Sequence, residues 1–101
     1  MNRFRVPADD AEAFRADLAA AVEVLSQRPG FVAADSGRNL DDPDLWALVT
    51  RWVDVGSYRR ALSSYDVKLT AVPLLGRALD EPSAFEGLDG ELNEAIPRTT
   101  G

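Results

Sequence analysis

The N-terminal part of the chain predicts a strand followed by a helix. Residues 2–6 alternate between arginines and less polar side chains, a period of two that is typical of a β-strand. Residues 9–27 place apolar side chains three and four positions apart, which predicts a helix with one buried face. Asp9 or Asp10 can cap the first turn of this helix, and Pro29 marks its end.

The middle of the chain predicts a β-hairpin. Residues 31–40 and 45–53 are two strand-like segments on either side of a short turn rich in aspartate and proline. The second segment is almost entirely apolar, which indicates an interior strand with both faces covered. Its period of two places Trp46 and Trp52 on one face and Arg51 on the other.

The remaining pattern predicts two short helical segments and a final strand. Asp54 is expected to cap the first segment, and Ser63-Ser64 to break or bend it. The second segment covers about residues 66–75. We expect the last strand at residues 83–88.

This order of elements, β-α-β-β-α-β, predicts an α+β domain with the ferredoxin-like arrangement, a four-stranded antiparallel sheet with two helices on one face. We expect this domain to comprise residues 1–88 and residues 89–101 to form an acidic, flexible tail. The sheet face without helices would carry apolar side chains that one chain of this length cannot cover. We therefore expect a homodimer in which two sheets pack face to face as a dimeric α/β barrel.

The composition is that of an ordinary globular protein, with 46% hydrophobic and 28% charged residues. The sequence contains no cysteine and no histidine, which excludes thiolate and imidazole nucleophiles and the usual zinc and haem ligands. Acid–base chemistry therefore falls to Asp, Glu, Tyr, Lys or a bound substrate. Three aspartates at positions 41, 42 and 44 could hold a divalent cation, but turn formation explains such a cluster more simply. We expect neither a metal nor a bound cofactor.

The net charge of −6 is concentrated near the C-terminus, where residues 80–101 carry six acidic residues against Arg98 alone. The rest of the chain has no basic face, so we expect no binding to nucleic acid or to an anionic membrane. Neither an apolar run of the roughly 20 residues that span a bilayer nor an apolar signal segment is present, so we expect a cytoplasmic protein. The excess of arginine over lysine and the many alanines are typical of a GC-rich bacterial genome.

Four side chains are candidates for a functional site. Asn2 shares the core side of its strand, where its amide could stabilise a developing oxyanion; a strand-end amide in contact with solvent is the alternative. Trp52 could shape a pocket or pack in the core or an interface. Tyr58 and Tyr65 are seven residues apart and would lie on one side of an unbroken helix, where a phenol could relay a proton.

Three short motifs occur together along the chain. They are Asn2-x-Phe4-x-Val6-Pro7-Ala8, Arg28-Pro29-Gly30-Phe31, and Leu48-Val49-Thr50-x-Trp52 followed by Tyr58. Over about residues 2–88 the chain thereby resembles the antibiotic biosynthesis monooxygenase (ABM) domain of dimeric α/β-barrel proteins. The resemblance implies the same fold and one pocket per subunit, between the sheet and the helices.

Proteins of this type include haem-degrading oxygenases and cofactor-independent oxygenases that oxidise reduced polycyclic phenols with molecular oxygen. The resemblance places the tryptophan of the haem degraders on Ala61 and their histidine on about Thr70, so haem degradation is not expected. For a cofactor-independent oxygenase, Asn2 could hydrogen-bond the substrate oxyanion and Trp52 could shape the pocket. A tyrosine at position 58 or 65 could then relay a proton.

The leading hypothesis is therefore a cofactor-independent monooxygenase that oxidises a small aromatic or quinol-like metabolite. One alternative is a non-catalytic module that binds a small ligand or regulates, and another is a different reaction on this scaffold, such as isomerisation or dehydration of a small acid. A roomy pocket that contains Asn2 would favour catalysis, whereas a filled core at that place would favour the binding module.

Overall fold

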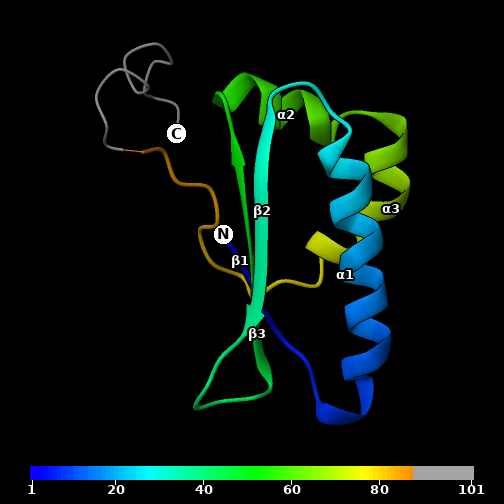
Figure 1. Cartoon of the computed structure of the whole chain (residues 1–101), viewed down its shortest axis with the longest axis vertical. Coiled ribbons are helices and arrows are strands. Elements are labelled where there is room, and N and C mark those ends of the chain that lie inside the picture. The colour runs from blue at the N-terminus through cyan, green and yellow to red at the C-terminus, as the bar shows by residue number, and fades with distance from the viewer. Residues whose placement is uncertain (88–101) are drawn as a thin grey trace.

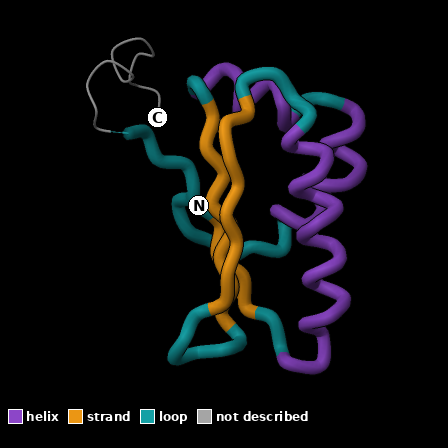
Figure 2. Tube along the Cα trace, viewed as in Figure 1, coloured by secondary structure: helices purple, strands orange, loops and turns teal. Residues whose placement is uncertain are grey.

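A three-stranded antiparallel sheet with helices on one face makes up the fold (Figure 1, Figure 2). The computed structural model describes residues 1–87. The strands are β1 (Asn2–Arg5), β2 (Phe31–Arg38) and β3 (Leu45–Trp52), and the helices are α1 (Ala11–Ser26), α2 (Val55–Leu62) and α3 (Tyr65–Leu75). The predicted α+β, ferredoxin-like fold is confirmed, while the dimeric barrel stays a prediction. No helix within this part of the chain is long and apolar enough to cross a bilayer.

β3 is the central strand, with β1 and β2 antiparallel on either side of it. Its apolar sequence correctly predicted the interior position. β2 pairs along the whole of β3, with Phe31 opposite Trp52. β1 is only half as long, and its first residue, Asn2, lies opposite Leu48. The part of β3 beyond Leu48 therefore has no β1 residue beside it.

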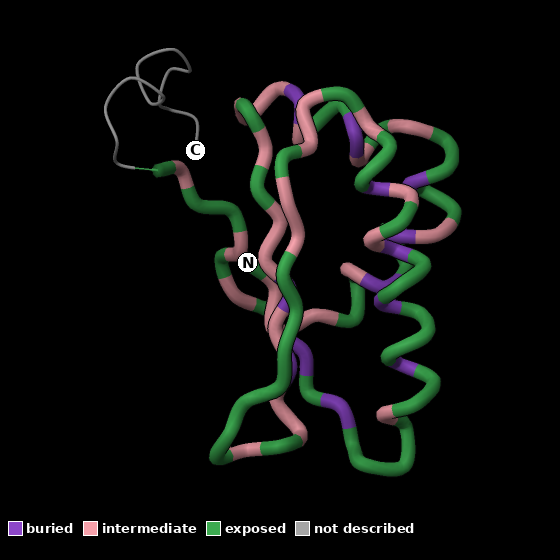
Figure 3. The backbone as a smooth tube through the Cα atoms, in the orientation of Figure 1, coloured by how far each residue is buried: buried purple, intermediate pink, exposed green. Residues whose placement is uncertain are grey.

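The core lies between the sheet and the helices. Alternation along β3 sends Trp46 and Leu48 into it, and both are at most 3% exposed. The ring of Phe14 on α1 lies 5.1 Å from that of Phe4 and 5.3 Å from that of Trp46, measured between centroids. The inner faces of α1 and α3 supply most of the other buried side chains (Figure 3), namely Leu18, Ala21, Leu25, Val67, Ala71 and Leu74. Each large apolar side chain buried in this way contributes about 1.5–3 kcal/mol, so this layer fixes β3 against the helices.

α1 begins without the aspartate cap that the sequence predicts. A 3₁₀ turn at Ala8–Asp10 leads directly into the helix, and the side chain of Asp10 accepts no capping hydrogen bond. The backbone of Asp10 has φ −101° and ψ 0°, whereas a capping residue needs an extended conformation. Its N–H donates instead to the carbonyl of Pro7 at 2.9 Å. The predicted helix is confirmed, but the predicted cap is wrong.

The break between α2 and α3 falls at Ser63-Ser64, as the sequence predicts. The Ser64 hydroxyl accepts a hydrogen bond from the N–H of Val67 at 3.4 Å and so caps α3. Asp54 caps α2 as predicted, because its carboxylate accepts from the N–H of Ser57 at 2.7 Å. Such side-chain acceptors satisfy N–H groups that have no partner within the helix.

The predicted fourth strand at residues 83–88 is wrong, because the chain described there has no regular strand. After α3 the chain runs along the edge of β1 with two main-chain hydrogen bonds. The N–H of Leu79 donates to the carbonyl of Arg3 at 2.8 Å, and the amino group of Met1 donates to the carbonyl of Ser83. This segment occupies the side of β1 where the fourth strand of a ferredoxin-like sheet is expected.

The stretch that runs along β1, between Leu79 and Ser83, contains Pro82, which has no N–H to donate to a regular strand pairing there. An ion pair anchors the segment instead, with Arg3 donating two hydrogen bonds of 2.8 Å to the carboxylate of Glu81. The segment then passes to the side of the sheet away from α1 (Figure 1). The predicted tail at residues 89–101 lies outside the described residues.

Gly30 forms the tight turn from α1 to β2. Its φ of +89° lies in the left-handed region that favours glycine. A Cβ at this position would overlap the side chain of Ser57 on α2 and lie 3.2 Å from Cγ2 of Val53. The Gly30 carbonyl also accepts from the N–H of Val53 at 2.8 Å. This glycine therefore lets α2 pack directly against the start of β2.

We predict that Gly30→Ala lowers the free energy of unfolding by about 3 kcal/mol, because it adds backbone strain to an overlap with Ser57. Gly37→Ala is the matched control: nothing lies within 4 Å of the added Cβ, and we expect a change within about 0.5 kcal/mol. Thermal and urea unfolding of both variants measure the difference. Equal stability of the two variants would contradict the account of this turn.

Candidate functional site

A pocket of about 550 Å³ lies at the start of β1, where β3 pairs with β2 on one side but has no strand on the side of β1. Small-molecule sites in proteins commonly have volumes of about 300–1,000 Å³. The pocket is lined by Met1, Asn2, residues 49–55, Tyr58 and residues 83–87. Both ends of the described chain thus meet β3 and α2 at one place.

The pocket extends around the open edge of β3. By the alternation of the strand, Thr50 and Trp52 reach it from the face covered by helices, whereas Val49 and Arg51 reach it from the opposite face. The family resemblance implies a pocket between the sheet and the helices. The observed pocket is open to both faces because β1 begins only at Asn2, opposite Leu48.

Trp52 forms a fixed aromatic wall of the pocket. Its indole N–H donates to the hydroxyl of Thr50 at 3.0 Å. Its ring meets that of Phe31 edge to face, with centroids 5.3 Å apart and planes at 86°, and lies 5.9 Å from the ring of Tyr58. Aromatic pairs in these arrangements contribute about 0.5–1.5 kcal/mol beyond the area that they bury. The indole is therefore held in place from both sides.

Tyr58 reaches the pocket from α2. Burial of its phenol raises the pKa above the ordinary value of 10.0, and the positive charge of Arg59 only partly opposes this. The phenol is therefore protonated at neutral pH, so that Tyr58 can donate a hydrogen bond or a proton but is not a base.

Asn2 is half-buried and lines the same pocket from the first position of β1. No hydrogen bond within residues 1–87 engages its side-chain amide, which leaves the amide N–H groups for a ligand. The structure therefore brings three of the four predicted residues together around one pocket: Asn2, Trp52 and Tyr58.

Tyr65 lies apart from the other three predicted residues. It is the first residue of α3, is 74% exposed and does not line the pocket. The spacing of seven residues from Tyr58 would place both phenols on one side of a continuous helix, but the break at Ser63-Ser64 puts them on two helices.

The sequence model of the antibiotic biosynthesis monooxygenase family matches residues 1–71, from β1 into α3. This chain belongs to the ABM family. The matched region includes Asn2, Trp52 and Tyr58, and the wall of the pocket formed by residues 83–87 lies beyond it.

Solved structures support the assignment of this ABM-family chain. It is similar to SnoaB, a cofactor-independent oxygenase from Streptomyces nogalater, with 27% identity over 87% of this chain and 92% of SnoaB and a TM-score of 0.67. A conserved protein from Methanosarcina mazei Go1 has 21% identity over 80% of this chain and 79% of that one, with a TM-score of 0.66. A Nitrosomonas europaea protein that carries the family's name has 21% identity over 85% and 93%, and a TM-score of 0.66. The last two show the fold alone, and no curated protein matches this chain in sequence.

Sequence reasoning did not place Arg51 or Glu86 in the pocket of this ABM-family chain. Arg51 was predicted on the outer face of β3, and the open edge of the strand brings it to the pocket. Glu86 fell within the predicted last strand, where no pattern pointed to a site. The contacts that carry the segment of Glu86 to β1 join residues nearly 80 positions apart, which periodicity cannot reveal.

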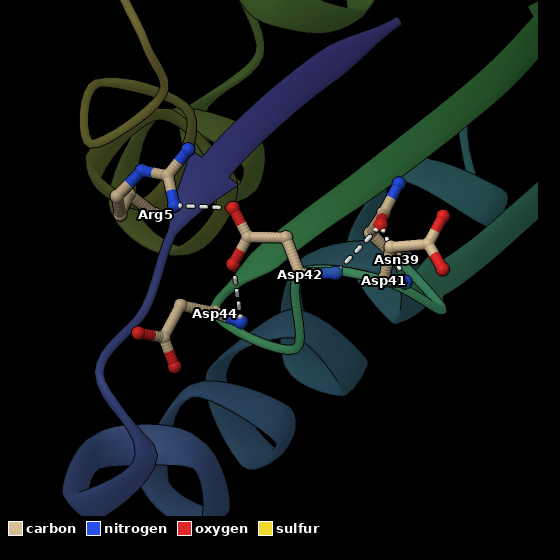
Figure 4. A network of polar contacts seen from close by, with 5 residues as sticks. All are labelled: Arg5, Asn39, Asp41, Asp42 and Asp44. Atoms are coloured by element: carbon tan, nitrogen blue, oxygen red, sulfur yellow. Dashed lines mark hydrogen bonds and ion pairs between the residues drawn. The ribbon is translucent and has the colours of Figure 1, made fainter.

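The aspartate cluster between β2 and β3 forms a turn (Figure 4). The side-chain oxygen of Asn39 accepts from the N–H groups of Asp41 and Asp42, both at 2.8 Å. The carboxylate of Asp42 accepts from the N–H of Asp44 at 3.2 Å and from Arg5 at 2.8 Å, and its pKa is lowered chiefly by the bond from Arg5. Turn formation therefore accounts for the cluster, and no three metal-ligating side chains converge within residues 1–87.

A second hollow, of about 390 Å³, lies between α1 and β2 in the ABM-family chain. Trp46 lines it, and the guanidinium carbons of Arg38 and Arg15 lie 4.6 and 5.3 Å from the centroid of its ring. None of the four predicted site residues lines this hollow. The pocket at the start of β1 is therefore the candidate site.

Asp54 links the stability of the pocket to pH, because it caps the helix that carries Tyr58. Hydrogen bonds from Ser57 lower the pKa of Asp54 below its ordinary value of 3.8. The ionised carboxylate thus stabilises the fold above about pH 3.8, and this contribution is lost as the pH falls through the lower folded-state pKa.

We predict that Asp54→Ala lowers the free energy of unfolding by about 1 kcal/mol at neutral pH, whereas Asp54→Asn, which still caps, changes it little. On acidification, the wild-type chain should lose stability relative to Asp54→Asn, because asparagine does not titrate. Urea unfolding from about pH 7 to pH 3 measures both effects. A constant difference between wild type and Asp54→Asn over this range would contradict the linkage.

Proposed function

We propose that this chain is a cofactor-independent monooxygenase that oxidises a small aromatic or quinol-like metabolite with molecular oxygen. The observation that carries the proposal is one pocket with a free amide, Asn2, beside an aromatic wall, Trp52 and Tyr58, in a chain of the ABM family. The similarity to SnoaB, itself a cofactor-independent oxygenase, supports it.

The proposed reaction in the pocket has three parts. The substrate loses a proton at an activated methylene or phenol group, the resulting anion is stabilised, and oxygen converts the methylene to a carbonyl with release of water. The electrons for oxygen reduction come from the substrate, so a CH₂ group and O₂ give a C=O group and H₂O. Asn2 donates a hydrogen bond to the oxyanion, Trp52 stacks on or borders the ring, and Tyr58 donates a proton.

The haem-degrading branch of the family does not fit this chain. The sequence contains no histidine, and the resemblance places the tryptophan and histidine of that branch on Ala61 and on about Thr70. Ala61 is 1% exposed in the core and has no aromatic ring.

A homodimer is the second part of the proposal. Figure 1 shows no helix on the face of the sheet away from α1, and two valines, Val32 and Val53, lie at the end of the sheet where Phe31 pairs with Trp52. These valines are 56% and 50% exposed in the single chain. We propose that a second copy of the chain covers this face and completes a dimeric α/β barrel.

We predict that the chain consumes oxygen above the autoxidation background with at least one anthrone- or dihydroquinone-type compound. Asn2→Ala should lower this rate by about 100- to 1,000-fold, since one hydrogen bond to the oxyanion is lost. Tyr58→Phe should also lower it, whereas Tyr65→Phe, a change of the same kind outside the pocket, should leave it unchanged. An oxygen electrode measures all four proteins.

Background uptake with every compound would contradict the oxygenase and favour the non-catalytic binding module. Uptake that Asn2→Ala does not alter would contradict the proposed place of the reaction.

For the dimer, we predict a mass of about twice 11.0 kDa in light scattering at micromolar concentration. Val53→Asp places a charge on the proposed interface and should shift the mass toward the monomer. A wild-type chain that is monomeric at this concentration would contradict the barrel.

A further inference from the structure

Glu86 lines the pocket, and one oxygen of its carboxylate has no hydrogen-bond partner. Oε2 of Glu86 is buried, and no donor within residues 1–87 reaches it. Glu86 belongs to the segment of residues 83–87 that forms one wall of the pocket. A buried acceptor without a donor is unfavourable, and such groups in folded proteins usually meet water or a ligand.

The segment that carries Glu86 is anchored to β1 a few residues earlier. Arg3 donates two hydrogen bonds to Glu81, both at 2.8 Å, and the amino group of Met1 donates to the carbonyl of Ser83. These contacts fix the chain up to three residues before Glu86. The carboxylate is thereby held at the same end of β1 as the proposed oxyanion site.

The other ionisable groups that line the pocket are engaged or carry a proton. Asp54 accepts hydrogen bonds at the start of α2, which lower its pKa. Tyr58 keeps its proton at neutral pH because burial raises its pKa, and the Met1 amino group is bonded to a main-chain carbonyl. Arg51 is a cation. Among the ionisable groups of the described chain that line the pocket, Glu86 is thus the one that can accept a proton from a ligand.

We propose that Glu86 is the general base that removes the acidic proton of an anthrone-type substrate in this pocket. The inference rests on the proposed function for the class of substrate, but it concerns a step that precedes the reaction with oxygen.

In this step the C–H bond of the activated methylene group breaks, and its proton forms an O–H bond with the carboxylate of Glu86. The electron pair delocalises through the rings onto the carbonyl oxygen of the substrate, which becomes an enolate. Asn2 donates a hydrogen bond to that oxygen, and Arg51 adds positive charge to the same pocket. The step involves neither oxidation nor reduction, so it takes place without oxygen.

Deuterium exchange under nitrogen tests this step directly. Anthrone is incubated with the full chain in D₂O, and its methylene signal is followed by proton NMR. The wild-type chain should speed the loss of this signal above the rate in buffer. Glu86→Gln should lower the catalysed rate by about 100-fold, because general bases contribute about 10²- to 10⁴-fold. Asp80→Asn, which neutralises an exposed acid outside the pocket, six residues before Glu86, should leave the rate unchanged.

Chemical rescue separates a base from a structural role. Formate added to Glu86→Ala supplies a diffusible carboxylate, and it should restore part of the exchange if Glu86 acts as the base. Equal exchange in wild type and Glu86→Gln, absence of catalysed exchange in the wild type, or failure of formate to restore exchange in Glu86→Ala would overturn the proposal.

The outcome is independent of the oxygenase assay. Exchange that depends on Glu86, without oxygen uptake, would support the base and contradict the monooxygenase. Oxygen uptake by a chain whose exchange does not depend on Glu86 would support the monooxygenase and contradict the assignment of Glu86 as the base.

Discussion

β1 is four residues long and β3 is eight, and the site depends on this difference in length. Because β1 begins only at Asn2, opposite Leu48, the last half of β3 has an open edge on that side within the described fold. A longer β1 would fill the place of the pocket with main chain. The short strand leaves both faces of β3 accessible there, and it sets an amide at the rim of the resulting space.

The same edge explains why distant segments share the site. β1 bonds β3 on one side and the chain after α3 on the other, through the Arg3–Glu81 ion pair and the bond from Leu79. Trp52 and Tyr58 come from β3 and α2, whose packing Gly30 permits by making room for Ser57. An amide, an aromatic wall and a carboxylate thus meet at one pocket, and this is the combination that deprotonation of an aromatic ketone requires.

The hydrophobic periodicity of the sequence correctly predicted the helices and strands that bury one face. It did not predict features of the structure that depend on single polar contacts. The alternation of β3 correctly placed Trp46 on the face opposite Arg51, and the side chain of Asp54 correctly predicted the start of α2. The cap at Asp10 failed because a 3₁₀ turn precedes α1. The prediction of the fourth strand failed because the chain runs along β1 before residue 83, through a stretch that contains Pro82, and the place of Glu86 depends on an ion pair between residues 78 positions apart. Such long-range polar pairing leaves no trace in local sequence.

The two tryptophans allow the most direct test of the central claim, that the pocket at the start of β1 holds an aromatic substrate. Trp52 lines this pocket and Trp46 lines the second hollow, so their indole N–H signals in NMR report on different places. The signals are assigned with Trp52→Phe, and anthrone is titrated under nitrogen. We expect the Trp52 signal to shift while that of Trp46 stays in place. A shift of the Trp46 signal alone, or no shift of either at saturating anthrone, would contradict it.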